Sequence, residues 1–216
     1  MSTMQYNSPN KAQRKAGQTP LAIVYHITVG TAQSVIQTFM NPATEKSTHY
    51  LILKNGDVVQ FVPESMSAWS NGIVWKPTAR MVLERLAHTE YNPNDWTLSI
   101  EHEVYTNEPL TEAQYTASAQ LTDRLTKLYD ISLDTIHLIR HQEIRASKTC
   151  PGSLDVNRII RMVLEKRNPN LPNVAYNTET ITKLNAIRLT ILKLQEILSN
   201  LLRSRSLGAI KKDSEK

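Results

Sequence analysis

The spacing of apolar residues along the chain predicts strands and helices in alternation. Residues 21–27, LAIVYHI, form a short, continuous run rich in β-branched side chains, which is typical of a buried strand. The ten residues at 31–40 place apolar side chains at helical spacing and end shortly before Pro42. Residues 47–62 hold two β-rich runs around Asn55-Gly56, a strong signal of a tight turn, and therefore predict a hairpin.

The same alternation continues through the middle of the chain. After an irregular stretch rich in tryptophan and proline, residues 97–105 predict another strand. Thr111 opens a helix, because Thr111 to Gln114 fits the capping-box pattern. Residues 135–140 predict a short strand, and 154–166 predict a closing helix. We therefore expect an α/β fold, with a mixed central β-sheet flanked by helices.

A linker and a basic helix are predicted to follow this unit. Residues 168–178 contain two prolines and four asparagines, which is typical of a linker. Beyond them, apolar residues recur at alternating spacings of three and four, as in the seam of a short coiled coil. The seam consists of Leu184, Ile187, Ile191, Leu194, Leu198 and Leu201. We predict a domain at 1–167, a linker at 168–178 and a helix at 179–216 that either forms a homo-oligomer, serves targeting or docks on its own domain.

Positive charge is concentrated in this C-terminal part. Residues 179–216 hold 8 Lys+Arg against 4 Asp+Glu, which leaves 17 against 16 for residues 1–178 out of totals of 25 and 20. A basic tail suits an anionic wall polymer, an anionic membrane or nucleic acid. The sequence has no recognition-helix motif and no interleaving of aromatic and basic residues, so we expect no nucleic-acid partner. No run approaches the ~18 apolar residues of a membrane span, so we expect no transmembrane segment.

The only cysteine of the chain, Cys150, lies nine residues after His141 in the segment HQEIRASKTCPG. A lone cysteine cannot form an internal disulfide, so it is packing, a nucleophile or a metal ligand. A zinc hydrolase needs three protein ligands and one open position for water. His26, at the end of a predicted strand, would complete such a set. Spacing alone does not decide between these roles, because histidines at strand ends are common.

Six segments together resemble the zinc-dependent N-acetylmuramoyl-L-alanine amidases of the type-2 amidase family, which includes phage endolysins and bacterial autolysins and shares its fold with peptidoglycan recognition proteins. The resemblance covers about residues 8 to 160. The segments, in the order of the family, are SPNKAQR, IVYHITVG, STHYLILKNGDVVQFVP, AWSNG, LSIEHE and HQEIRASKTCPG. The resemblance implies hydrolysis of the amide bond between N-acetylmuramic acid and L-alanine in peptidoglycan, with muropeptides as substrates.

Matching positions imply the roles of individual residues. His26, His141 and Cys150 match the three ligands of one Zn²⁺ per chain. Lys148 matches a basic residue that stabilises the reacting carbonyl, and Glu101 matches a catalytic glutamate found in one branch of the family. Bound zinc lowers the pKa of water to about 7, and a carboxylate can carry the proton to the departing amine.

Further residues are expected to contact the substrate. Many relatives have Ala-Trp-His-Ala-Gly where this chain has Ala68 to Gly72, a departure that affects substrate preference rather than the ligand set. The expected substrate residues are His49, Tyr50, Trp69, Ser70 and Asn71. Relatives with a catalytic tyrosine place it near Tyr50, but its matching position here is Thr48. We therefore expect Glu101 to carry the proton.

Two other functions remain open at this stage. One is a non-catalytic peptidoglycan-binding module of the same fold, and members of that kind usually lose a metal ligand. The other is an adaptor whose coiled-coil tail is the functional part. The N-terminal residues contain no apolar core of a Sec-type signal peptide. For an enzyme that acts on the cell wall, this favours phage-type release or non-classical secretion, with a cytoplasmic recycling enzyme as the alternative.

Overall fold

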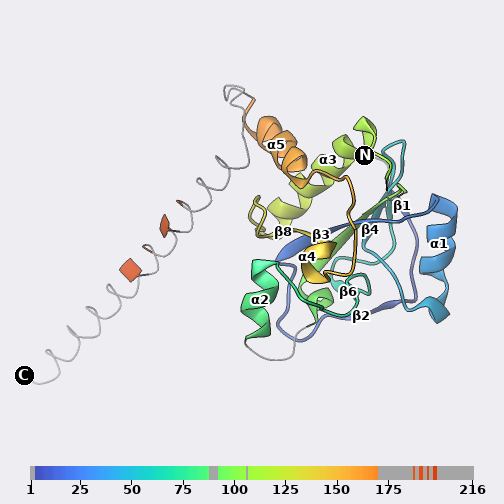
Figure 1. Cartoon of the computed structure of the whole chain (residues 1–216), viewed down its shortest axis with the longest axis horizontal. Helices are drawn as coiled ribbons and strands as arrows, with labels where there is room; N and C mark the ends of the chain where they lie inside the picture. The colour runs from blue at the N-terminus through green and yellow to red at the C-terminus, as the bar shows by residue number, and fades with distance from the viewer. Residues whose placement is uncertain are drawn as a thin grey trace, which may run out of the picture. The chain divides into compact units, whose positions relative to one another are not determined.

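A mixed β-sheet covered by helices forms the first of two units of the chain, Met1–Leu171 and Pro172–Lys216 (Figure 1). The computed structural model describes residues 3–87, 92–105 and 107–169, and it also describes Ile187, Thr190, Ile191, Leu194, Ile197 and Leu198. The expected α/β fold with a mixed central sheet is confirmed.

The strands are β1 (Thr3–Gln5), β2 (Lys11–Gln13), β3 (Ala22–Ile27), β4 (Tyr50–Ile52), β5 (Val58–Gln60), β6 (Met66–Ala68), β7 (Thr97–His102) and β8 (Leu138–Arg140). The helices are α1 (Ala32–Met40), α2 (Arg80–Leu86), α3 (Glu112–Leu128), α4 (His141–Ile144) and α5 (Val156–Arg167), with 3-10 turns η1 (Pro42–Thr44) and η2 (Pro93–Asp95). Six strands form one sheet in the order β1-β5-β4-β7-β3-β8, while β2 and β6 form an antiparallel pair. The middle strand β3 runs parallel to both β7 and β8.

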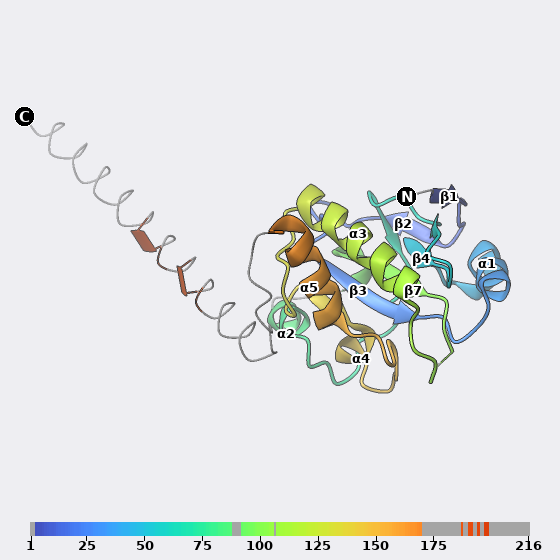
Figure 2. The ribbon, with the colours of Figure 1, turned by 90° about the horizontal axis from the view of Figure 1, so that it is seen from above.

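The two faces of β3 enter different hydrophobic clusters, because its side chains alternate between the faces. Ile23 and Ile27 pack in a cluster with residues of α3 and α5, which lie side by side over this face (Figure 2). Ala22 and Val24 pack with residues of α2 and α4. By the same alternation, His26 lies on the second face. The strand therefore presents a histidine beside α4 while its other side chains form the core.

Local sequence signals explain the turns that hold these elements. The hydroxyl of Thr111 accepts a hydrogen bond from the Gln114 amide, and the Gln114 side chain accepts one from the Thr111 amide, so the predicted capping box begins α3. Gly56 turns the hairpin between β4 and β5 with a φ of 87°. A Cβ at this position would also meet the Ala113 carbonyl oxygen at 2.9 Å. This turn therefore needs glycine both for its backbone angle and for the approach of α3.

The elements predicted from hydrophobic spacing are present with different bounds. The strands predicted at 97–105 and 135–140 are shorter, as β7 and β8. Helix α2 lies in the stretch predicted to be irregular, and Val82 is its only fully buried residue, so its apolar periodicity is weak. Strands β1, β2 and β6 have three residues each. Segments this short show no recognisable alternation of apolar and polar residues.

Most of the C-terminal prediction lies outside the described residues. This holds for nearly all of the linker predicted at 168–178 and for most of the helix predicted at 179–216. The described residues of the second unit are helical. Four of them belong to the predicted seam, and each has at least half of its surface exposed: Ile187, Ile191, Leu194 and Leu198. Self-association of this helix stays a prediction. Within the described ranges, no helix has the length and hydropathy needed to cross a membrane.

Candidate metal centre and active-site cavity

Three parallel strands bring the candidate residues to one edge of the sheet. In the pairing of β3 with β7, His26 is opposite Glu101. On the other side of β3, Tyr25 is opposite Arg140, and His141 is the next residue, at the start of α4. Since the carboxyl ends of parallel strands meet at one edge, residues distant in sequence converge there. The fold thus brings His26, Glu101 and His141 to the same edge of the sheet.

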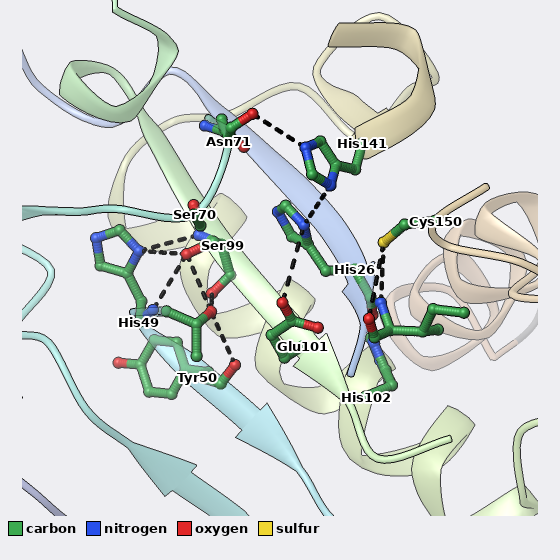
Figure 3. A network of polar contacts seen from close by, with 12 residues as sticks. His26, His49, Tyr50, Ser70, Asn71, Ser99, Glu101, His102, His141 and Cys150 are labelled. Atoms are coloured by element: carbon green, nitrogen blue, oxygen red, sulfur yellow. Dashed lines mark hydrogen bonds and ion pairs between the residues drawn. The ribbon is translucent and has the colours of Figure 1, made fainter. Parts of the chain in front are cut away.

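The predicted metal ligands meet in a small buried group (Figure 3). The Nδ1 atoms of His26 and His141 lie 3.0 Å apart. With the sulfur of Cys150, they make a set of three candidate ligand atoms that all lie within 4.8 Å of one another. The Oε1 atom of Glu101 lies 4.0 Å from Nδ1 of His26. The two nitrogens and the sulfur therefore face a common point with a carboxylate beside it.

Backbone groups orient two of these ligands. The main-chain carbonyl of Asn71 accepts a hydrogen bond from Nε2 of His141 at 3.0 Å, which leaves Nδ1 of His141 without a proton and facing Nδ1 of His26. The sulfur of Cys150 accepts a hydrogen bond from the Ile27 amide at 3.0 Å. A donor aimed at sulfur favours the thiolate, which is the form that binds metals. Both contacts favour the forms of these side chains that bind a cation.

Burial sets the charge states of the site. Burial lowers the pKa of His26 well below its usual range and the pKa of His141 to about 4, so both imidazoles are neutral at neutral pH. Burial raises the pKa of Glu101 to about 8, and the charge of Lys148 opposes this rise. Burial and the charge of Glu101 raise the pKa of Cys150, although a coordinated metal deprotonates such a thiol.

The donor set fits zinc. Two neutral imidazoles and one thiol are ligands that Zn²⁺ prefers, and three protein ligands leave a fourth position for a catalytic site. Two Zn–N bonds of about 2.0–2.1 Å each are compatible with nitrogens roughly 3 Å apart. Nε2 of His26 and Oε2 of Glu101 are buried without a hydrogen-bond partner. Such groups are costly in a merely structural cluster and common at functional sites.

A cavity of about 720 Å³ opens onto this group. Glu101 and Lys148 line it together with the three candidate ligands, as predicted from the resemblance. The positive charge of Lys148 lowers the pKa values of Glu101, His26 and Cys150. The lining therefore combines a metal-binding set, a carboxylate and a cation.

Sequence reasoning missed two parts of the cavity wall. One is the inner face of α1, which contributes Ser34 and Thr38 among others. The available signal was two polar side chains four residues apart on the helix that follows the His26 strand. The other is Arg145, whose Nε donates to the Ser147 hydroxyl at 3.2 Å. Its position between two predicted ligands could have suggested it.

Three of the five predicted substrate residues lie at the cavity, namely Trp69, Ser70 and Asn71. Trp69 and Ser70 are partly exposed, whereas Asn71 has no exposed surface. The amides of Ser70 and Asn71 donate to the side-chain oxygen of Asn94 at 3.3 and 3.0 Å. These hydrogen bonds hold the segment that follows β6 in its conformation.

The structure does not bring His49 and Tyr50 to the cavity lining. The His49 ring is buried between strands, where Nδ1 accepts from the Ser99 amide at 3.0 Å and Nε2 donates to the Met66 carbonyl at 3.0 Å. The Tyr50 hydroxyl donates to Glu64 and accepts from Arg124. Both side chains have hydrogen-bond partners within the fold, so neither belongs to the proposed substrate site.

Comparison with known proteins identifies the family. The sequence profile of the N-acetylmuramoyl-L-alanine amidase family, Amidase_2, matches residues 16–153, more than half of the chain. The chain belongs to this family. It is accordingly an enzyme that hydrolyses the amide bond between N-acetylmuramic acid and L-alanine in peptidoglycan. A comparison with curated proteins found no match.

Solved structures show the same fold. A selenomethionine derivative of AmpD has a TM-score of 0.60 and 23% identity, over 74% of this chain and 94% of that one. The amidase LysC from Clostridium intestinale has a TM-score of 0.53 and 20% identity, over 76% and 98%. AmiD from E. coli, in complex with a muropeptide, has a TM-score of 0.52 and 23% identity, over 69% and 60%. At these identities the likeness establishes the fold.

Proposed function

We propose that the chain is a zinc-dependent amidase in which His26, His141 and Cys150 hold one zinc ion. The observation that carries this proposal is the convergence of three buried candidate ligand atoms within 4.8 Å of one another, at a cavity that also contains Glu101 and Lys148. When bound, zinc supplies Lewis-acid chemistry: it lowers the pKa of a coordinated water to about 7 and polarises a carbonyl.

Glu101 is the residue that moves the proton. Its carboxyl group lies beside His26 and lines the cavity, and its side chain is 13% exposed, so it can reach a substrate or water. The positive charge of a zinc ion beside it would favour its ionised form despite burial. As a carboxylate it would accept a proton from the attacking water and deliver it to the amine of L-alanine as the C–N bond breaks. Tyr50 does not compete for this role, since its hydroxyl is held by Glu64 and Arg124.

Lys148 stabilises the charge that develops on the amide oxygen. A positive group near a reacting carbonyl stabilises the negative charge that develops on its oxygen. Trp69 and Ser70 form the part of the wall that contacts the sugar or the peptide. Arg145 adds a second cation to the wall, suited to a carboxylate of the stem peptide. AmiD was solved with anhydro-N-acetylmuramic acid-L-Ala-D-gamma-Glu-L-Lys, a ligand of the kind we propose here.

Metal analysis and mass spectrometry of digested peptidoglycan test this proposal together. We expect about one zinc per chain, as in a single catalytic site, and new L-alanine amino termini without new reducing sugar ends. New reducing ends would identify a glycosidase and overturn the proposal. Tight binding to peptidoglycan with no new termini would identify the non-catalytic binding module instead. The complete candidate ligand set supports the enzyme.

The C-terminal helix has a separate proposed role. We propose that its exposed seam packs against the same helix of a second copy, since the seam repeats at coiled-coil spacing and its four described residues are exposed. Deleting residues 172–216 should convert a dimer to a monomer in sedimentation velocity, with unchanged hydrolysis of soluble muropeptides. Reduced lysis of whole walls by a deletion that leaves the mass unchanged would favour targeting by the basic tail.

A further inference from the structure

Asn71 lies directly behind both histidines of the proposed metal centre (Figure 3). It has no exposed surface. Its main-chain carbonyl accepts a hydrogen bond from Nε2 of His141. Since a neutral imidazole carries one proton, this contact places the proton on Nε2 and leaves Nδ1 as the ligand atom.

Thr97 determines which way the Asn71 side chain is turned. The Thr97 hydroxyl donates its only proton to the Pro93 carbonyl at 2.8 Å. Toward Asn71 it can therefore only accept, and it does so from Nδ2 at 3.0 Å. The amide nitrogen of Asn71 must face Thr97, which turns the side-chain oxygen the other way.

Two buried atoms are left without partners on that side, Oδ1 of Asn71 and Nε2 of His26. Figure 3 shows the outer nitrogen of the His26 ring turned toward Asn71. One atom is an acceptor, and the other becomes a donor once Nδ1 of His26 is the ligand.

We infer that Asn71 is a positioning residue for both histidine ligands: its main-chain carbonyl holds His141, and its side-chain carbonyl holds His26 through the Nε2 proton. This inference rests on the proposed zinc centre. Histidine ligands of metals generally donate their second ring N–H to such a group, which fixes the tautomer and the ring orientation. Asn71 thus acts through the ligands. This positioning role takes the place of the substrate contact that we expected for Asn71 from the sequence.

Zinc affinity of the full-length protein tests this role, measured by competition with a chromophoric chelator. Asn71→Ala removes the side-chain carbonyl and keeps the main-chain one. We expect its zinc Kd to rise about 10- to 100-fold, the usual effect of losing such a partner. Asn71→Asp keeps an acceptor oxygen toward His26 but loses the donor to Thr97, so it should restore part of the lost affinity. If Asn71→Ala does not fold, Thr97→Val is used instead, because it frees the amide to turn, and we expect a smaller loss of affinity.

Nitrogen NMR of labelled imidazoles in the zinc-loaded protein provides a second readout. With Nδ1 of His26 bound to zinc, we expect its Nε2 proton to exchange slowly with water in the wild type and faster in Asn71→Ala. Asn157→Ala is the matched control, since Oδ1 of Asn157 is also buried without a partner but lies on α5, away from the ligands. This control should leave zinc affinity and the exchange of the His26 Nε2 proton unchanged.

The outcomes separate this inference from the proposed function. An unchanged Kd and unchanged proton exchange in Asn71→Ala, or an equal loss of zinc affinity in Asn157→Ala, would overturn the positioning role. A raised KM for muropeptide at saturating zinc, with unchanged zinc affinity, would also overturn it and assign a substrate contact. If the wild-type protein itself binds no zinc, the proposed function fails first.

Discussion

The Nδ1 atoms of His26 and His141 lie 3.0 Å apart, although the two residues are separated by 115 positions in the sequence. The parallel pairing of β3 with β8 produces this approach, because the paired residues Tyr25 and Arg140 directly precede the two histidines. Both rings are buried, and both Nδ1 atoms point to the same place. Such an arrangement favours a shared cation over simple packing.

Removing one of these nitrogens should remove the metal. We expect His141→Ala to retain no stoichiometric zinc after dialysis and to lose amidase activity, because two remaining ligands do not make a stable catalytic site. Metal analysis by plasma mass spectrometry and a muropeptide assay measure the two effects. His137→Ala is the matched control, since His137 contacts Asp134 and does not line the cavity. Retention of zinc by His141→Ala would contradict the ligand assignment.

The two acidic residues of the IEHE segment should behave differently. Glu101→Gln removes the proton carrier while keeping shape, so kcat should fall by about 10²- to 10⁴-fold with zinc content unchanged. Glu103→Gln is the control, because the Glu103 carboxylate accepts from the amides of Ala32 and Lys54. That variant should lower the melting temperature but leave kcat of the zinc-loaded protein near the wild-type value. A normal kcat in Glu101→Gln would move the proton role to another group.

Much of the fold is predictable because its main elements carry strong local signals. The run at 21–27 has the β-branched composition of a buried strand, and Asn55-Gly56 and Thr111 mark a turn and a helix start by their own chemistry. Helix α2 was missed because only Val82 is fully buried, which leaves no apolar stripe to read. The short strands β1, β2 and β6 depend on long-range pairing, which local spacing does not reveal.

The candidate site was predictable only through the resemblance, since spacing alone leaves Cys150 undecided between three roles. The structure places Glu101 and Lys148 at the cavity with the three candidate ligands, and their catalytic roles stay predictions. Matching positions did not reveal that His49 points into the interior, because strand register decides which face a side chain occupies. The part played by Asn71 depends on the direction of its amide, which a sequence cannot show.

Lys148 should affect the rate of the reaction rather than metal binding. Lys148→Met keeps a side chain of similar length without the charge, so kcat should fall by about 10²- to 10³-fold, the typical cost of losing one group that stabilises the oxyanion. Lys148→Arg should recover part of the rate. Lys127→Met is the control, because Lys127 pairs with Asp123 on α3 and lies outside the cavity lining. Loss of zinc in Lys148→Met would instead indicate a structural role.

His49 makes the stability of the protein sensitive to acid. Burial and the charge of Arg14 lower its pKa from 6.5 to about 3. Between these values the unfolded chain binds a proton that the folded protein excludes, so the free energy of unfolding falls as the pH is lowered. One such group contributes about 1.4 kcal/mol per pH unit. From His49 alone we expect a loss of roughly 2–3 kcal/mol between about pH 6.5 and pH 4.5.

Urea unfolding at several pH values, with a chelator to keep the metal absent, measures this contribution. His49→Gln does not titrate but keeps a donor and an acceptor near the Met66 carbonyl and the Ser99 amide. This variant should be less stable than the wild type at neutral pH, because it loses the packing of the ring. As the pH falls below about 6.5, the wild type should lose stability more steeply, so the difference between the two proteins narrows. Parallel curves would mean that folded His49 takes up a proton, which contradicts its burial as a neutral ring.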